Sequence, residues 1–311
     1  MIMPIDKPEE ALPQPVLDAL NRQLAISMDA RNAEPDPEMG GLSPNQVTRL
    51  IYTEWGRPGA AVQFNTDVPL AELEKAECFR EARTLLKALH AAGEVRATTS
   101  KNLPRKFVAD VLPLMCDEKA LDEIHKYNKV VNEQDVPPLH YARVVAQAAG
   151  LARIRKGKFS VPASKCALLR DDRAGALFRC LFIAFFRKFN LAYTHRVVFE
   201  ARGLQTCVAY TLYRLGVVAT EWKPVDDLPD DTLLPAVREE IEIELDGRDY
   251  WTPEKLLSGR LIRWFIEWGL LEGRYQQEGR YLKRLEAVRT TPLYTAVLHF
   301  RLDPPDMEAP A

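Results

Sequence analysis

The chain has 311 residues and a net charge of −2; 47% of its residues are hydrophobic and 28% are charged. These values are ordinary for a globular protein with two or three cores, and they exclude binding to nucleic acid or membranes through overall charge alone. The five cysteines are scattered without a Cys-x-x-Cys pair, which is typical of reduced thiols in a cytoplasmic protein. The central apolar run, residues 181–186, is too short to span a bilayer, so no membrane partner is expected.

The first forty residues contain six prolines and little periodicity, and we expect them to form a flexible arm with at most a short helix around 15–27. A helix start follows at Ser43. Its hydroxyl is suited to cap the helix, Pro44 suits the first helical position, and Gln46 stands three residues on, as in a capping box. This pattern predicts a helix that runs to about residue 54.

A second pattern then recurs four times along the chain: an amphipathic helix ends on a glycine, and apolar residues follow at once. The glycines are Gly93, Gly150, Gly216 and Gly269. Glycine closes a helix well because it adopts a left-handed backbone without steric cost. A helix, a glycine, a strand, a turn and a second strand are typical of a winged-helix unit, so the sequence predicts such units in tandem.

We therefore predict a mainly α fold with small β-hairpins, built from tandem winged-helix-like units. The expected segments are a flexible arm (1–40), unit one with its N-terminal helix (41–135), unit two (136–175), a helical unit three (176–250), unit four (251–303) and a tail (304–311). The clearest hairpin is expected around residues 151–161, with its turn at 155–158. The alternation at 240–245 predicts a strand with a charged edge, and the segment 295–302 fits either a strand or a helix.

Three stretches carry a resemblance to known proteins: GLSPNQVTRLIYTEWG (41–56), VQFNTDVPLAELEKAECF (62–79) and LLKALHAAGEVRATTSKNLPRKFVADVL (85–112). They resemble a family of bacterial proteins of unknown function, in which a helix, a glycine and a short wing precede Asn-Leu-Pro-Arg-Lys-Phe-Val. Similar regions occur alone or attached to plasmid ORF-three-like proteins. The resemblance implies winged-helix-like repeats but no catalytic residues, because the family carries no assigned activity.

The best functional indication in the sequence is a basic block. Residues 136–170 contain no Asp or Glu but seven cations. Winged-helix proteins that bind DNA place one helix in the major groove and the wing beside the phosphates, where cations displace counterions. The candidate nucleic-acid-binding residues are therefore His140, Arg143 and Gln147 on the helix, and Arg153, Arg155, Lys156, Lys158 and Lys165 in or after the wing.

The alternative is that this basic face is covered by the protein itself. The segment 221–254 holds twelve acidic residues against three cations and is a candidate cover. The leading expectation is thus a non-enzymatic interaction or scaffolding protein with an unknown protein partner; a winged-helix DNA- or RNA-binding protein that uses residues 139–170 is the alternative. No catalytic residue, metal site or cofactor site is predicted, and Trp264 and Trp268 are assigned to a core or an interface between units.

Overall fold

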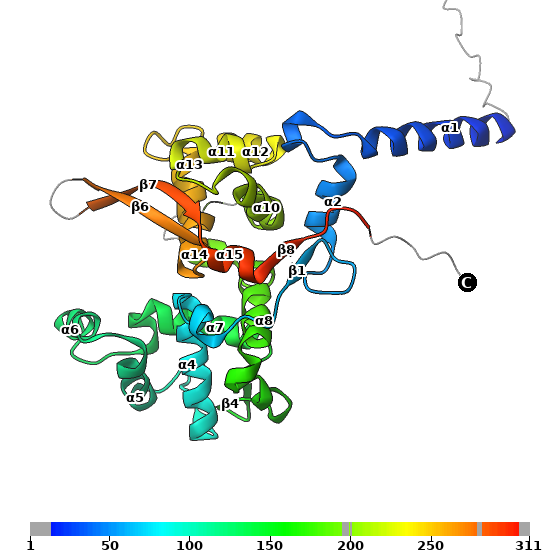
Figure 1. The fold of residues 1–311 in the computed structure, drawn as a ribbon. Coiled ribbons are helices and arrows are strands. Elements are labelled where there is room, and N and C mark those ends of the chain that lie inside the picture. The colour runs from blue at the N-terminus through cyan, green and yellow to red at the C-terminus, as the bar shows by residue number, and fades with distance from the viewer. Residues whose placement is uncertain (1–13, 195–198, 200, 279–281, 305–311) are drawn as a thin grey trace, which may run out of the picture.

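The computed structural model describes residues 14–194, 199, 201–278 and 282–304. Within these residues the protein is mainly helical with three small antiparallel sheets, which confirms the expected class. Helix α1 (Gln14–Ala33) projects from the body and buries no residue (Figure 1). It is longer than the short helix expected in the arm; residues 1–13 of that arm and 305–311 of the expected tail lie outside the described residues.

The first sheet belongs to a module that extends from residue 77 to residue 160. Its helices and strands follow in the order α4 (Glu77–Ala92), β2 (Val95–Arg96), α5 (Arg105–Met115), α6 (Glu118–Tyr127), α7 (Pro137–Ala148), β3 (Arg153–Arg155) and β4 (Lys158–Ser160). The strands lie in the order β2-β4-β3, and both pairs are antiparallel. The last strand of the module therefore pairs with its first, and closes it around one core.

A second module, from residue 208 to residue 290, has a similar element order. It contains α10 (Val208–Val218), β5 (Lys223–Pro224), α11 (Leu228–Thr232), α12 (Pro235–Leu245), α13 (Pro253–Leu257), a π-helical turn (Ser258–Ile262), α14 (Arg263–Glu267), β6 (Leu271–Glu278) and β7 (Leu282–Thr290). Its sheet has the order β5-β7-β6, which again places the last strand in the middle. We refer to residues 77–160 and 208–290 as the first and second modules.

The strand pairing of the modules crosses the boundaries of the four expected units. The expected units one and two contribute to one sheet, because Val95 of β2 pairs with Phe159 of β4. Units three and four are joined in the same way, by the pairing of Lys223 of β5 with Val288 of β7. The described residues thus contain two sheet-closed modules where the glycine pattern had suggested four.

Helix α8 (Ala174–Arg187) connects the two modules (Figure 1). It contacts α4 and α7 of the first module. On the other side, Phe178 and Phe182 each lie 5.2 Å, centroid to centroid, from the ring of Trp268, which follows α14 of the second module. Trp264 and Trp268 are buried, so the prediction that they lie in a core or between units is confirmed.

The two ends of the body meet beside this core. Strand β1 (Val62–Phe64) pairs antiparallel with β8 (Leu298–Phe300), which follows α15 (Pro292–Val297). The segment 295–302 is therefore helix first and strand afterwards. Helix α2 (Pro44–Tyr52) precedes β1 and has the capping box expected at Ser43 and Gln46. The remaining short helices are α3 (Leu70–Leu73) and α9 (Arg202–Thr206).

Two local predictions were wrong. Residues 240–245 are not a strand: they belong to α12, where Val237, Ile241 and Leu245 are buried at a spacing of four residues. The alternation of Glu with Ile arose because one apolar residue, Ile243, lies exposed on the outer side of the helix. Gly216 does not end a helix either, since α10 continues through it to Val218.

Candidate nucleic-acid interface

The outward face of the sheet β2-β4-β3 is basic. Because side chains alternate across a strand, Val95 and Phe159 point into the core, and Arg96 and Lys158 point out. The register pairs Arg96 with Lys158, and Lys158 with Arg155 on the other side. Three cations thus form a row across three strands. We call this row, together with Arg153 and Lys156, the basic sheet face.

A tight turn presents the fifth cation of this face. Lys156 and Gly157 connect β3 to β4 with φ angles of 49° and 72°, as in the two-residue turns that suit a hairpin. The backbone amide of Ala97 donates to the carbonyl of Gly157 at 2.8 Å, which holds the end of β2 against the turn. The hairpin expected in unit two is confirmed, and Lys156 lies exposed at its tip.

The cations of the basic sheet face are mostly unpaired. Lys158 forms an ion pair of 2.6 Å with Glu94, which precedes β2. In the described part of the chain, the side chains of Arg96, Arg153, Arg155 and Lys156 form neither a hydrogen bond nor an ion pair, and all four residues are exposed. Like charges that face each other across strands destabilise a sheet. An anionic partner would remove that repulsion.

The corresponding sheet of the second module is arranged differently. Glu272 of β6 lies opposite Arg289 of β7, and their side chains form an ion pair of 2.8 Å. Arg284 is paired with Asp226 at 2.8 Å. Opposite charges across these strands stabilise the sheet from within, so the two modules differ most clearly in this respect.

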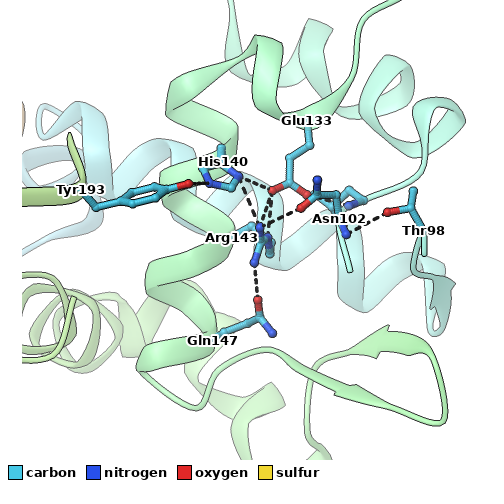
Figure 2. Close-up of polar contacts among 8 residues, drawn as sticks. Thr98, Asn102, Glu133, His140, Arg143, Gln147 and Tyr193 are labelled. Atoms are coloured by element: carbon cyan, nitrogen blue, oxygen red, sulfur yellow. Dashed lines mark hydrogen bonds and ion pairs between the residues drawn. The ribbon is translucent and has the colours of Figure 1, made fainter. Parts of the chain in front are cut away.

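The helix residues of the predicted site do not face an open groove. His140 is 8% exposed, and both ring nitrogens have partners: Nδ1 lies 2.6 Å from Glu133 Oε1, and Nε2 lies 3.0 Å from the Tyr193 hydroxyl (Figure 2). Arg143 donates to Glu133 at 2.7 and 2.9 Å and to Gln147 at 2.7 Å. The orientation expected for these three side chains is therefore corrected: they bind one another and Glu133 because α4 and α8 cover α7.

Glu133 is the centre of this buried network. It is 1% exposed, and its second oxygen accepts the backbone N–H of Leu103 at 2.6 Å. Burial raises the pKa of Glu133, but hydrogen bonds from His140, Arg143 and Leu103 outweigh burial and lower the pKa overall. The carboxylate therefore stays charged, and it ties α7 to the loop between β2 and α5.

Lys165, the last predicted residue, lies apart from the row. It is half-buried in a 3-10 helix (Ala163–Leu169) that follows β4. Sequence reasoning in turn missed Arg96 and Glu133. Arg96 lies outside the acid-free block, and only the pairing of β2 with β4 brings it beside Lys158. A buried carboxylate in a short polar segment gives no signal in the sequence.

The acidic segment 221–254 does not cover this face within the described residues. Its ion pairs stay within the second module: Lys223 binds Asp227 and Asp231, Arg238 binds Asp230, Arg248 binds Glu244, and Asp226 binds Arg284. Helices α11 and α12 lie at one end of the body, and β4 lies at the other (Figure 1). The basic sheet face is thus open to a partner.

Two other kinds of site are absent from the described residues: a metal site and a membrane span. In the ranges that the structure describes, no group of three or more His, Cys, Asp or Glu side chains is arranged to hold a metal ion. None of the helices in those same ranges has the length and apolar character needed to cross a membrane.

Comparison with known proteins adds one finding. Residues 74–174 match the family model described as the Y4jL N-terminal domain. The matched range begins just before α4 and ends after β4, so it contains the whole first module. It supports the resemblance of this region to an uncharacterised bacterial family. No curated protein and no solved structure matches the chain.

Proposed function

We propose that this chain is a non-enzymatic binding protein whose basic sheet face binds the phosphate backbone of nucleic acid. The observation that carries the proposal is the row Arg96–Lys158–Arg155, in which like charges face one another across three strands. Such a row is costly in the free protein and favourable beside phosphates. The opposite-charge pair Glu272–Arg289 in the second module supports the view that the row is a feature of the first module alone.

The element order of the two modules supports a winged-helix interpretation. In each, a helix and a short strand are followed by further helices and a hairpin whose second strand returns to the first. We propose that residues 77–160 form one winged-helix-like domain with its wing at 155–158, and that residues 208–290 form another. On this proposal the chain contains two tandem winged-helix-like domains, each assembled from parts of two of the units expected from the glycine pattern.

The buried network limits what the first module could recognise. Base edges are read by side chains that enter a groove, whereas phosphate contacts carry no sequence information. His140 and Arg143 of α7 are held by Glu133 and are not free to enter a groove. We therefore propose binding to the backbone through the wing, with little preference for sequence.

The experiment is a fluorescence-anisotropy titration of the full chain with labelled duplex DNA and duplex RNA at several salt concentrations. The variant changes Arg96, Arg155 and Lys158 to Gln. Each phosphate contact contributes about 0.9 to the slope of log K against log salt for B-DNA, so we expect the slope to fall by about 2 to 3. Affinity at low salt should fall for every sequence alike.

A matched control removes three cations from the sheet of the second module: Arg274→Gln, Lys283→Gln and Arg284→Gln. The change in net charge is the same, but these residues lie on the sheet of the second module, where Arg284 is paired with Asp226 and Arg274 lies over the Trp222 ring. Binding by the control should stay close to that of the unchanged protein. Equal losses in the two variants would reduce the effect to overall charge and refute the proposed face.

A packing role is proposed for the second module. Arg284 and Arg289 of its sheet are paired with Asp226 and Glu272, and the Trp268 ring packs against Phe178 and Phe182 of α8. We propose that it serves as a scaffold that holds the first module through α8, in line with the interaction and scaffolding role. Removal of Trp268 by a change to Ala should therefore loosen the first module as well, seen as faster amide exchange in α7.

A further inference from the structure

A cavity of about 270 Å³ lies between the two modules. Its walls come from α4, α7, α8 and the end of α14; the residues that matter here are Glu81, Tyr141, Phe185, Trp264, Glu267 and Trp268. The wall on α4 lies at the N-terminal end of this helix, whereas β2 follows its C-terminal end. The cavity is thus separate from the basic sheet face.

Aromatic rings form the apolar part of the cavity. The ring of Trp264 lies 5.6 Å from that of Tyr141 and 4.9 Å from that of Phe185, both in edge-on geometry. Such contacts fix the rings and leave π faces and edges for a small apolar group.

Carboxylates form the polar part. Among the described residues, Glu81 has neither an ion pair nor a hydrogen bond from its side chain. Glu267 has only weak partners: Arg263 Nε lies 4.0 Å from it and the Cys78 thiol lies 3.7 Å from it. Arg263 also lines the cavity; it is exposed and lies over the Trp264 ring, 4.4 Å from its centroid.

The charges of this site repel one another. Burial, followed by the nearby charges of Glu77 and Glu267, raises the pKa of Glu81 to about 8. Burial also raises the pKa of Glu267; the charge of Arg263 opposes this effect, and that of Glu77 adds to it. Arg263 is paired with Glu267, whereas Glu81 is a partly buried carboxylate without an ion pair among the described residues, which is unfavourable when it is charged. A cation brought in by a ligand would compensate it.

We propose that this cavity binds an aliphatic ammonium group. The ammonium contacts the carboxylates of Glu81 and Glu267, and its hydrocarbon chain packs on Tyr141, Phe185 and Trp264. An ammonium suits this site because a cation beside aromatic rings is attracted by their faces as well as by the carboxylates. A free amine and a lysine side chain of a partner protein present the same chemistry.

A larger depression adjoins the cavity, which favours a ligand that continues beyond the ammonium. Glu81, Pro137 and Pro138 line both. The depression has a volume of about 660 Å³, and its lining includes Asp117, Glu123 and Asp135 as well as one cation, Arg80. A second amine of a diamine, or the peptide around a lysine, would thus meet further carboxylates.

The test is a titration of the full chain, followed by tryptophan fluorescence and calorimetry, with n-butylamine, 1,4-diaminobutane and Nα-acetyl-lysine amide at pH 8.5. Saturable binding of the amines is expected, and butanol, which has the same length but no charge, should bind at least about tenfold more weakly. Tighter binding of the lysine derivative than of the diamine would indicate a protein partner; the reverse order would indicate a free amine. Binding of butanol as tight as that of butylamine would overturn the proposal.

Variants of the two carboxylates test whether the amine binds in this cavity. Glu81→Gln and Glu267→Gln should each weaken butylamine binding by about tenfold or more, since a hydrogen bond to a charged group is worth that much. The control, Glu239→Gln with Glu242→Gln, removes two exposed carboxylates from α12 and should leave binding unchanged. Thermal unfolding verifies that each variant is folded. Unchanged binding in two folded cavity variants would overturn the assignment.

Discussion

Arg96 of β2 lies directly opposite Lys158 of β4, and both side chains point away from the core. The strands are only two and three residues long, so this pair makes up a large part of the contact between them. The repulsion within the pair is offset in part by Glu94, which binds Lys158. A sheet selected for stability alone would carry opposite charges at these positions.

The first prediction concerns this pair. Arg96→Glu places a carboxylate opposite Lys158 and should raise the free energy of unfolding by about 0.2–1 kcal/mol, the usual range for a cross-strand charge pair. The same change should weaken binding to duplex DNA. Denaturant unfolding and an anisotropy titration measure the two effects, which are expected to have opposite signs.

The matched control is Arg289→Glu on the second module. There the new carboxylate faces Glu272, so an opposite-charge pair becomes a like-charge pair. The free energy of unfolding should fall by a similar amount. If both variants shift stability in the same direction, the register does not determine the effect and the argument for the basic sheet face loses its basis.

The sequence predicted the basic hairpin but not the row of three cations that crosses the sheet. Arg155 and Lys158 were visible because they flank a Lys-Gly turn inside an acid-free block. Arg96 is 62 residues upstream of Lys158, and nothing local specifies that two short strands so far apart will pair. Long-range register depends on how α4, α5 and α7 pack, and single-sequence patterns do not contain that information.

The second prediction concerns the buried network. Glu133→Ala leaves Arg143 and His140 without their acceptor inside the protein, and should cost about 3–5 kcal/mol of unfolding free energy. Tyr193→Phe removes only the bond to His140 Nε2 and should cost about 0.5–1.5 kcal/mol. Urea unfolding of both variants tests this order. Equal, small losses would show that Glu133 is not the centre of the network.

The lowered pKa of Glu133 gives the third prediction, on acid stability. A carboxyl whose folded pKa lies below its ordinary value of 4.5 stabilises the protein at pH values above 4.5, and this contribution is lost as the pH falls through the folded pKa. Glu133→Gln, which cannot ionise, should flatten the stability profile in that acid range. Unfolding free energies measured from pH 3 to 6 in both proteins provide the comparison.

The four recurring glycines show which structural roles a local sequence pattern can predict and which it cannot. Gly93, Gly150 and Gly269 have φ angles near 70°, as predicted for residues that end a helix. Gly216 also follows a helical pattern and precedes apolar residues in the sequence, but it lies within α10, where a Cβ would clash with the Tyr294 hydroxyl. Tyr294 comes from α15, so this glycine serves a packing contact that no local pattern reveals.

The fourth prediction separates these two roles. Gly216→Ala should destabilise the protein by about 1–3 kcal/mol, since the added methyl group displaces a hydroxyl that donates to the carbonyl of Leu212 at 2.6 Å. The cost should be smaller in a Tyr294→Phe background, which removes the clashing oxygen. A Cβ added at Gly93 meets open space, so Gly93→Ala should lower the free energy of unfolding only because the φ angle of 71° strains an alanine. This loss should not depend on Tyr294. A double-mutant cycle measures the coupling; additive effects at Gly216 and Tyr294 would contradict the packing explanation.

The fifth prediction concerns Glu81 in the cavity, where the stability of the protein changes with pH in the opposite direction from that at Glu133. Burial and the charges of Glu77 and Glu267 raise the pKa of Glu81 from 4.5 to about 8, so the folded state holds a proton that the unfolded state releases. Stability is therefore highest below pH 4.5 as far as Glu81 is concerned, and it falls as the pH rises from 4.5 to about 8. Glu81→Gln should remove this fall. At pH 8 the variant should be more stable than the unchanged protein by on the order of 1–2 kcal/mol after allowance for solvent screening, and near pH 4 the two should agree.

Saturating butylamine should reduce the difference at pH 8, because the ammonium compensates the charge that the substitution deletes. A difference that persists unchanged in the presence of the amine would mean that the raised pKa has a cause other than an unfilled cation site.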